Sequence, residues 1–270
     1  MPEPKKLPKN YENNPFFVAS NGMTLLFNLA KPVGVFLVFL SVVSFLFSRF
    51  PSGEENKNSM HDLTAQLSAW TPSDWGFAIS TGLIIGLAVA MIAALIGGVS
   101  SYTAAQIAKG RHVTLSEAFR VSFDNLWSYL WLKIIIFVKV ILWSLLLIVP
   151  GIIMSVRYSL ADIAFFDDDK NLRGNAAVKE SLRLTKGAWL TTFASNALFN
   201  LLTLGAVTYV VSTSANAVLY RQFDKLSDKK PDAHWLSWVT LVLPFIFILF
   251  ILALIISIAV AIGLIGQSTF

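Results

Sequence analysis

The sequence predicts an all-α fold: a polytopic bundle of six to seven transmembrane helices with two amphipathic helices at the membrane interface. Of the 270 residues, 55% are hydrophobic and only 14% are charged, and the mean hydropathy is +0.65. This composition lies outside the range of ordinary soluble domains. Apolar runs of about 20 residues, the length that a helix needs to cross a bilayer, recur along the chain. We therefore expect a polar, basic cytoplasmic tail at 1–24 and one transmembrane domain over 25–270.

Seven apolar segments are long enough to be considered as spans. The first is longer than the core of a signal peptide and lacks a small-x-small cleavage site, so we expect it to be retained. Pro150 and Gly151 interrupt a long apolar stretch. Proline removes a backbone donor and glycine permits left-handed angles, so this pair is predicted to form the turn of a hairpin. A break near Gly205 divides the stretch that follows. The expected spans are about 25–48, 76–101, 131–149, 151–166, 184–204, 206–226 and 235–266.

Two further segments, about 114–130 and 175–187, are predicted to be helices that lie along the membrane surface. In the first, Thr114 precedes Glu117 by three residues, the spacing at which each side chain can cap the other's backbone amide. Apolar residues then recur at helical spacing on one face, and charged residues occupy the other face. This amphipathic pattern is typical of interfacial helices, and the basic residues are expected to contact anionic lipid.

Positive charge predicts the orientation. If the N-terminus and the segments 101–133 and 167–188 lie inside, thirteen Lys and Arg residues are on the inner side and two are in the outer loop at 49–75. The connector at 221–230 holds four more, so the ratio is 17 to 2 with the connector inside and 13 to 6 with it outside. The first ratio favours seven crossings with the C-terminus outside, and six crossings is the alternative. The net charge of +5 fits this topology and does not indicate a nucleic-acid partner.

Small residues recur at every fourth position of the second expected span. Because four residues return nearly to the same face of a helix, they form a flat stripe on which another helix can pack closely. Two of its members form a GxxxG pair, which is a weak motif on its own. We interpret the stripe as a packing surface rather than as the lining of a pore. It consists of Ala78, Gly82, Gly86, Ala90, Ala94 and Gly98.

Lys139, Arg157 and Asp162 lie inside the expected third and fourth spans. Charge within a bilayer is costly, so each is a candidate functional residue. One hypothesis is a site for an anion or a phospholipid headgroup formed by Lys139 and Arg157, with Asp162 neutralising one of these cations. Asn196 and Asn200 would assist. The favoured hypothesis is structural: Lys139 extends to the interface and Arg157 bonds carbonyl groups freed by the Pro-Gly turn.

The sequence gives little indication of a catalytic site. The chain has no cysteine, which excludes disulfides, thiolate metal sites and cysteine nucleophiles. His61, His112 and His234 lie in separate polar connectors, and there is no HExxH, serine elbow or glycine-rich phosphate loop. The acidic run 167–169 could hold a divalent cation, but successive residues on a helix point in different directions, so a capping role is favoured. We expect no catalytic site, cofactor or metal, and a protein that is not an enzyme.

Four short motifs carry a resemblance to known proteins. They are "PG" at 150–151, "YSLA" at 158–161, "AVKESLRLTKGAWLTTF" at 177–193 and "TYVVSTSANAVLYRQF" at 208–223. Over roughly 114–226 the chain resembles a family of uncharacterised bacterial integral membrane proteins, and more loosely the membrane domain attached to some glycerophosphodiester phosphodiesterases. The stretch between Phe193 and Tyr220 is shorter than in that family, and an extra hydrophobic span follows. The resemblance implies a membrane fold and a cytoplasmic position for the Tyr220 segment, but no reaction, since the chain has no phosphodiesterase domain.

The predicted function is that of a non-catalytic component of the cell envelope. We expect a multi-pass protein of the cell membrane, with its N-terminus in the cytoplasm, that contacts membrane phospholipids. The small-residue stripe predicts packing with a second copy or with another membrane protein. The alternative is a transporter or channel for a small anionic solute, which would need a continuous polar path through the spans. Lys139 and Arg157 in a water-filled cavity would favour that alternative.

Overall fold

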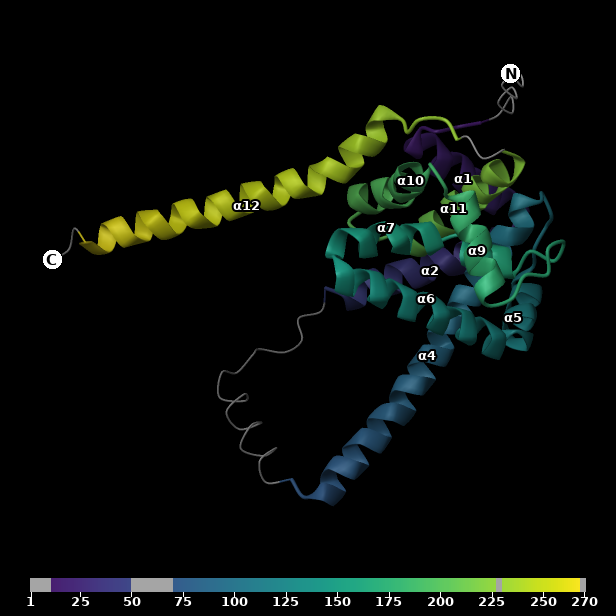
Figure 1. Cartoon of the computed structure of the whole chain (residues 1–270), viewed down its shortest axis with the longest axis horizontal. Coiled ribbons are helices and arrows are strands. Elements are labelled where there is room, and N and C mark those ends of the chain that lie inside the picture. Colours follow the sequence, from purple (N-terminus) through teal and green to yellow (C-terminus); the bar gives the residue numbers. More distant parts are fainter. Residues whose placement is uncertain (1–10, 50–69, 227–229, 268–270) are drawn as a thin grey trace.

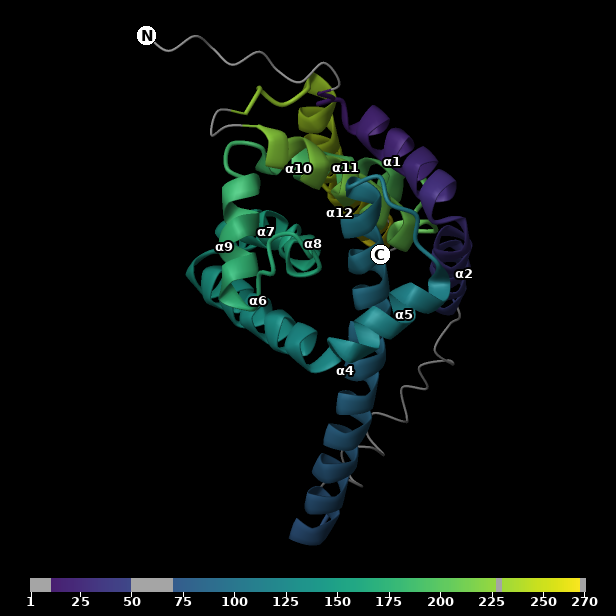
Figure 2. The same ribbon diagram turned by 90° about the vertical axis from the view of Figure 1, so that its right-hand side faces the viewer.

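A computed structural model of the chain describes residues 11–49, 70–226 and 230–267. Over these ranges it contains eleven helices and no strand, which confirms the all-α prediction. The helices form a bundle from which α12 and the N-terminal half of α4 project (Figure 1 and Figure 2). Their bounds are α1 Pro15–Leu29, α2 Lys31–Phe47, α4 Pro72–Ala108, α5 Leu115–Asp124, α6 Leu126–Leu146, α7 Ile148–Tyr158, α8 Ala161–Phe165, α9 Asn175–Leu184, α10 Trp189–Leu202, α11 Thr208–Lys225 and α12 Trp235–Gln267.

The bundle is organised around α11, which packs against α1, α2, α4 and α10. Val211, Leu219 and Phe223 of α11 are fully buried, so this helix supplies much of the core. Its closest neighbour is α1, where Gly22 lies against the backbone of α11. A Cβ atom built on Gly22 would lie 2.6 Å from the carbonyl carbon of Ser214, so only glycine permits this approach.

Within the described residues, four helical segments are long and apolar enough to cross a membrane. They are α4, α6, the continuous segment Ile148–Phe165 that combines α7 and α8, and Trp235–Ile258 of α12. These segments agree with the prediction of a membrane protein, but the expected count of six to seven spans is not confirmed. α2 is apolar but has only 17 residues, and α10 has 14. α11 has 18 residues, many of them polar.

The structure differs from the prediction at the N-terminus. The expected span 25–48 is two helices, α1 and α2, because the chain leaves helical geometry at Ala30 (φ −141°, ψ 45°). Pro32 explains the break, since it has no amide to donate back to the preceding turn. Helix α1 also begins inside the expected tail, where the Asn14 side chain accepts a hydrogen bond from the Phe16 amide at 3.0 Å. Residues 1–10 of the tail and 50–69 of the predicted outer loop are outside the described ranges.

The predicted hairpin is present, but its turn is three residues earlier than expected. Helix α6 ends at Leu146, and the chain reverses at the extended residue Leu147 (φ −162°, ψ 146°). Pro150 lies in the first turn of α7, where a helix has no partner for its amide groups. Gly151 is helical and serves close packing, because a Cβ atom there would lie 2.9 Å from the Cα of Ser144 on α6.

The surface helix expected at 114–130 is shorter than predicted. Thr114 begins it as expected, and its hydroxyl accepts from the Glu117 amide at 3.3 Å. The Glu117 carboxylate does not return the bond. It accepts from the Tyr102 hydroxyl of α4 at 2.7 Å instead. Helix α5 then ends at Asp124, and Leu126 starts the separate helix α6. The second surface helix is α9, and the interfacial position of both stays a prediction.

Candidate functional site

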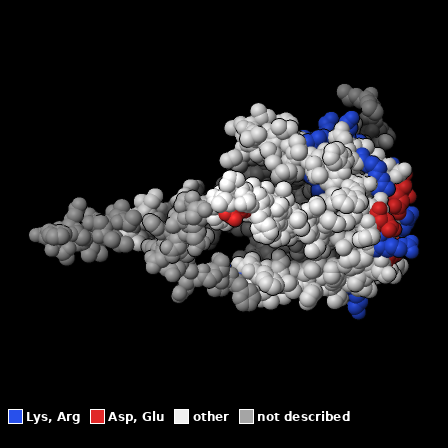
Figure 3. Space-filling model, turned by 90° about the horizontal axis from the view of Figure 1, so that it is seen from below, with Lys and Arg blue, Asp and Glu red and all other residues white. Residues whose placement is uncertain are grey.

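Charged side chains gather at one end of the bundle. On the face shown in Figure 3, Lys, Arg, Asp and Glu cluster at that end, while most of the remaining described surface is uncharged. Ion pairs join the C-terminal end of α4, the segment between α8 and α9, helix α9 and the C-terminal part of α11. This arrangement separates a polar end from an apolar body, as expected where a membrane bundle reaches water.

Asp167 lies at the centre of one ionic network in this end. It is only 3% exposed, and its carboxylate pairs with the Lys109 ammonium at 2.6 Å and accepts from the Tyr220 hydroxyl at 2.6 Å. Burial alone would raise the pKa of the Asp167 carboxyl, but hydrogen bonds from Lys109 and Tyr220 outweigh burial and lower the pKa. Lys109 also pairs with Asp169 at 3.0 Å. The end of α4 and helix α11 are therefore both linked to the segment between α8 and α9 through one buried carboxylate.

A second network lies beside the first and is centred on Glu180 of α9. Arg183, one turn further along, donates two hydrogen bonds to this carboxylate at 2.7 and 2.8 Å, and Lys170 pairs with it at 2.7 Å. Hydrogen bonds from Arg183 and from Lys170, against the opposing effect of burial, lower the pKa of Glu180 to about 2. Lys170 also pairs with Asp224 of α11 at 2.5 Å. The network fixes α9 to the end of α11.

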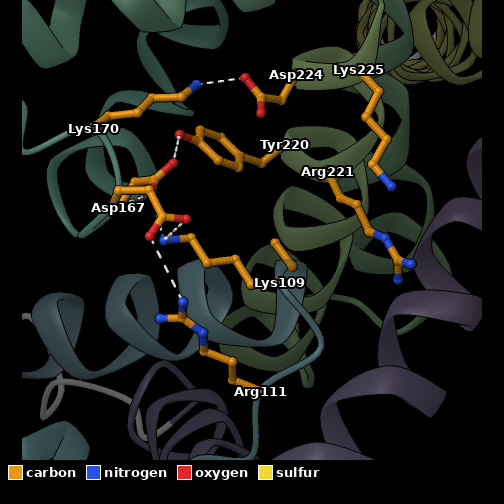
Figure 4. Close-up of a pocket in the computed structure, with 10 residues that line it drawn as sticks. Lys109, Arg111, Asp167, Lys170, Tyr220, Arg221, Asp224 and Lys225 are labelled. Atoms are coloured by element: carbon orange, nitrogen blue, oxygen red, sulfur yellow. Dashed lines mark hydrogen bonds and ion pairs between the residues drawn. The ribbon is translucent and has the colours of Figure 1, made fainter.

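A pocket of about 430 Å³ opens between these networks. Its lining contains five cationic and three carboxylate side chains, an excess of two positive charges. Arg221 and Lys225, one turn apart on α11, form no ion pair within the described residues. Figure 4 shows them on the opposite side of the pocket from Asp167, with no interaction drawn to either. We call this the basic end pocket. It is lined by Ala108, Lys109, Arg111, Asp167, Asp169, Lys170, Tyr220, Arg221, Asp224 and Lys225.

The structure does not bring Lys139 and Arg157 together as one site. Lys139 donates to the Asn175 side chain at 2.5 Å, whereas Arg157 donates to the Leu182 carbonyl at 3.3 Å. Both partners belong to α9 and are seven residues apart, which is about 10 Å along a helix. Each cation therefore contacts a different end of α9. The carbonyl bonded by Arg157 is not one freed at the Pro-Gly turn, as the sequence had suggested.

Asp162 has a partner that the sequence analysis did not assign to it. Its carboxylate pairs with Lys133 of α6 at 2.5 Å, and the Lys133 ammonium also lies 5.0 Å from the ring centre of Tyr129.

Asn196 and Asn200 of α10 lie elsewhere, beside α11. Asn196 donates to the Asn216 side chain at 2.8 Å, and Asn200 donates to the Asn196 carbonyl at 2.8 Å. Lys133 and Asp162 line one open pocket, Asn196 and Asn200 line another, and none of these residues lines the basic end pocket.

The small-residue stripe of α4 divides into two halves. Ala94 and Gly98 are buried, and a Cβ atom on Gly98 would lie 3.0 Å from the Ser122 side chain of α5. Gly82, Gly86 and Ala90 are exposed on the projecting half of the helix. A Cβ atom on Gly82 or Gly86 would meet no described atom within 4 Å. Among the described residues, only the second half of the stripe therefore packs against other helices.

The described part of the chain contains no group of three His, Asp or Glu side chains that could hold a metal ion. The run 167–169 serves the ionic network and a local turn, in which the Asp169 amide donates to Asp167 at 3.1 Å. His112 is exposed. The His234 ring accepts from the Leu236 amide at 3.2 Å at the start of α12. His61 is outside the described residues.

Sequence reasoning missed the residues that form the basic end pocket. Lys109, Arg221 and Lys225 were counted only as topology signals, and Asp167 as a capping residue. Tyr220, which belongs to the motif that resembles the bacterial family, was the one available signal. It lies 53 positions from the carboxylate that it binds, and no local pattern connects the two.

Comparison with protein-family models, with curated proteins and with solved structures found no match. The resemblance to the family of bacterial membrane proteins therefore stays a prediction.

Proposed function

We propose that the protein is a non-catalytic integral membrane protein that binds the headgroups of anionic phospholipids in its basic end pocket. The observation that carries this proposal is the excess of two positive charges in the pocket, together with the Arg221 and Lys225 side chains, which form no ion pair with another described residue. A phosphate group accepts several hydrogen bonds, and arginine presents its donors in a geometry that matches phosphate oxygens. The pocket lies at the polar end of the bundle, where headgroups would be found.

The rest of the molecule supports a role in contact with lipid or membrane partners. Beyond the buried Ser237 and Thr240, the apolar part of α12 is exposed, and the projecting half of α4 is exposed over Leu83, Ile84 and Leu87. Such apolar surfaces need lipid or another protein to cover them. Lys139 and Arg157 contact α9, so the alternative of a transporter for an anionic solute through these two residues has less support.

The binding test compares two double variants that remove the same charge. Arg221→Gln with Lys225→Gln changes the basic end pocket, and Lys179→Gln with Lys186→Gln changes two exposed cations of the same region that do not line it. A hydrogen bond to a charged group contributes about 1.5–3 kcal/mol, so loss of the two bonds to the headgroup phosphate should weaken binding by the pocket variant at least about 100-fold, whereas the control lysines make no such bond.

Native mass spectrometry of the detergent-extracted protein, titrated with phosphatidylglycerol or phosphatidylcholine, measures the effect. We expect selective retention of phosphatidylglycerol by the wild type and by the control variant, and its loss from the pocket variant. Equal binding of the two lipids by the wild type, or an equal loss in both variants, would contradict the proposal.

The membrane orientation belongs to the same proposal. The charged end and the N-terminus are cytoplasmic, the chain crosses the cell membrane seven times, and the C-terminus is outside. The 14 residues of α10 extend only about 21 Å, which is short for a membrane span. Whether α10 crosses the membrane therefore decides between six and seven crossings. A reporter fused to the C-terminus should be active outside the cytoplasm, and a cytoplasmic signal would rule out seven crossings.

A further inference from the structure

The basic end pocket has two sides of different chemistry. Three of its five cations, Lys109, Arg111 and Lys170, are paired with carboxylates of the two networks. Arg221 and Lys225 form no ion pair with another described residue, so a phosphate group is expected beside them. The pocket volume of about 430 Å³ falls within the range of about 300–1,000 Å³ that is typical of small-molecule sites. The pocket can therefore hold more of a headgroup than its phosphate.

The other side of the pocket offers hydrogen-bond acceptors. Figure 4 shows the Asp224 side chain extending towards Lys170, away from the ends of Arg221 and Lys225. Lys170 pairs with Asp224 Oδ1 at 2.5 Å, and Arg183 lies 3.5 Å from the same oxygen. The second oxygen, Oδ2, has no partner among the described residues, and the side chain is 40% exposed. An ionised carboxylate only accepts hydrogen bonds, so a group that binds there must donate.

Asp169 is a second acceptor of the same kind. It lines the pocket, and its side chain is 66% exposed. Within the described residues, the contact of its Oδ1 atom is with Arg111 at 3.7 Å, which is too long for a hydrogen bond. Two carboxylates with unused acceptor capacity therefore border the pocket that Arg221 and Lys225 also line.

The surroundings of these carboxylates favour an uncharged donor over a cationic one. Lys170 and Arg183 already face Asp224, and two cations likewise face Asp169. A headgroup ammonium would be repelled by these cations, whereas a hydroxyl group donates without adding charge. The ligand that fits both sides of the pocket is an anionic phosphodiester whose headgroup carries hydroxyl groups.

We propose that the basic end pocket selects phosphodiester lipids with an uncharged, hydroxylated headgroup, such as phosphatidylglycerol, and that the Asp224 and Asp169 carboxylates accept hydrogen bonds from the hydroxyl groups. This inference rests on the proposed function and adds to it the class of headgroup and two specificity-determining residues. The proposed function itself requires only that anionic lipids bind better than neutral ones.

Native mass spectrometry of the detergent-extracted full chain tests the inference with four lipids that have identical acyl chains. Phosphatidylmethanol is the matched control, because it carries the same phosphodiester charge as phosphatidylglycerol but no hydroxyl group. Phosphatidylethanolamine supplies an ammonium donor, and phosphatidylcholine supplies no donor. A hydrogen bond to a charged group contributes at least about 10-fold to binding, so phosphatidylglycerol should be retained about 10-fold more strongly than phosphatidylmethanol. Both neutral lipids should be retained least.

The outcomes separate this inference from the proposed function. Equal retention of phosphatidylglycerol and phosphatidylmethanol, with both above phosphatidylcholine, would overturn the inference and leave the proposed function intact. Stronger retention of phosphatidylethanolamine than of phosphatidylglycerol would also overturn it, because the carboxylates would then bind an ammonium. Equal retention of all four lipids would contradict the proposed function and the inference together.

The variant Asp224→Ala tests whether this carboxylate provides the selectivity. It removes both acceptor oxygens, while Lys170 and Arg183 stay paired with Glu180. The preference for phosphatidylglycerol over phosphatidylmethanol should fall from about 10-fold to about 3-fold, with the remainder provided by Asp169. Both anionic lipids should remain bound, which distinguishes a loss of selectivity from a loss of the site.

Asp169→Ala covers the case in which Asp224→Ala does not fold, because Lys109 keeps its pair with Asp167. It should also lower the preference to about 3-fold. Asp124→Ala is the control, since it removes the same charge from an exposed position of α5 that does not line the pocket. It should keep the preference of the wild type. An unchanged preference in folded Asp224→Ala or Asp169→Ala would overturn the role of that carboxylate.

Discussion

The contact between α1 and α11 offers the sharpest test of the fold. In Gly22→Ala, the new Cβ atom would lie 2.6 Å from the Ser214 carbonyl carbon and 3.1 Å from the Ala215 amide nitrogen. Ordinary contacts begin near 3.4 Å and the Ser214 carbonyl oxygen lies closer still, so the helices would have to separate by about 1 Å. The neighbouring atoms are backbone and cannot rotate away. Overpacking of this kind costs about 1–3 kcal/mol, and the better helix propensity of alanine returns up to about 1 kcal/mol.

The expected net loss is about 1–2 kcal/mol, or roughly 2–8 °C in melting temperature for a chain of this size. The eight tryptophans allow melting to be followed by intrinsic fluorescence of the detergent-solubilised protein. Gly86→Ala on α4 is the matched control, because the same substitution there meets no described atom within 4 Å. If Gly22→Ala melts at or above the wild type, the close approach of α1 and α11 is refuted.

Three further predictions concern the charged residues. Asp167→Asn removes the charge from a buried carboxylate and leaves Lys109 paired with Asp169 alone, so it should lower the free energy of unfolding by about 1–3 kcal/mol in chemical denaturation. The pKa of Glu180 is lowered from 4.5 to about 2, so its contribution to stability is complete above about pH 4.5 and is lost as the pH falls toward 2. Melting temperatures recorded between pH 6 and pH 3 should fall less steeply for Glu180→Gln than for the wild type, and parallel curves would contradict this. Arg157→Ala frees a backbone carbonyl and should cost about 1–2 kcal/mol, whereas Lys139→Ala loses a bond to a more exposed amide and should cost less than about 1 kcal/mol, as thermal melts of both variants would show.

Composition and local patterns were sufficient to predict the class of the fold. A long apolar run must form a helix in lipid because every backbone polar group needs an internal partner, and the four candidate spans follow from that rule. Residues that typically begin or end helices were also informative. The chain turns at Gly205, where φ is +86°, and α5 begins after Thr114.

The placement of Asp162 shows where local patterns fail. In an antiparallel hairpin centred on Pro150 and Gly151, the residue opposite Asp162 is Lys139. The actual reversal at Leu147 places Lys133 opposite Asp162 instead, fourteen positions before the turn against fifteen after it. A shift of three residues in the turn thus changed the partner of the buried acid. The sequence signals a reversal near the proline, but the proline occupies the first turn of the next helix rather than the reversal itself.

The expected number of spans is not confirmed for a related reason. Hydropathy treats each apolar stretch as if it faced lipid, yet α11 lies at the centre of the bundle and contacts other helices on several sides. Its polar residues are tolerated there because their groups bond locally or to neighbours, as Thr213 does with the Tyr209 carbonyl at 2.7 Å and Ser214 with the Val211 carbonyl at 3.1 Å. A central helix of this kind supplies hydroxyl and amide groups to the interior. The projecting half of α4 and most of α12 instead carry exposed apolar surface, which is why hydropathy identifies both helices as candidate spans.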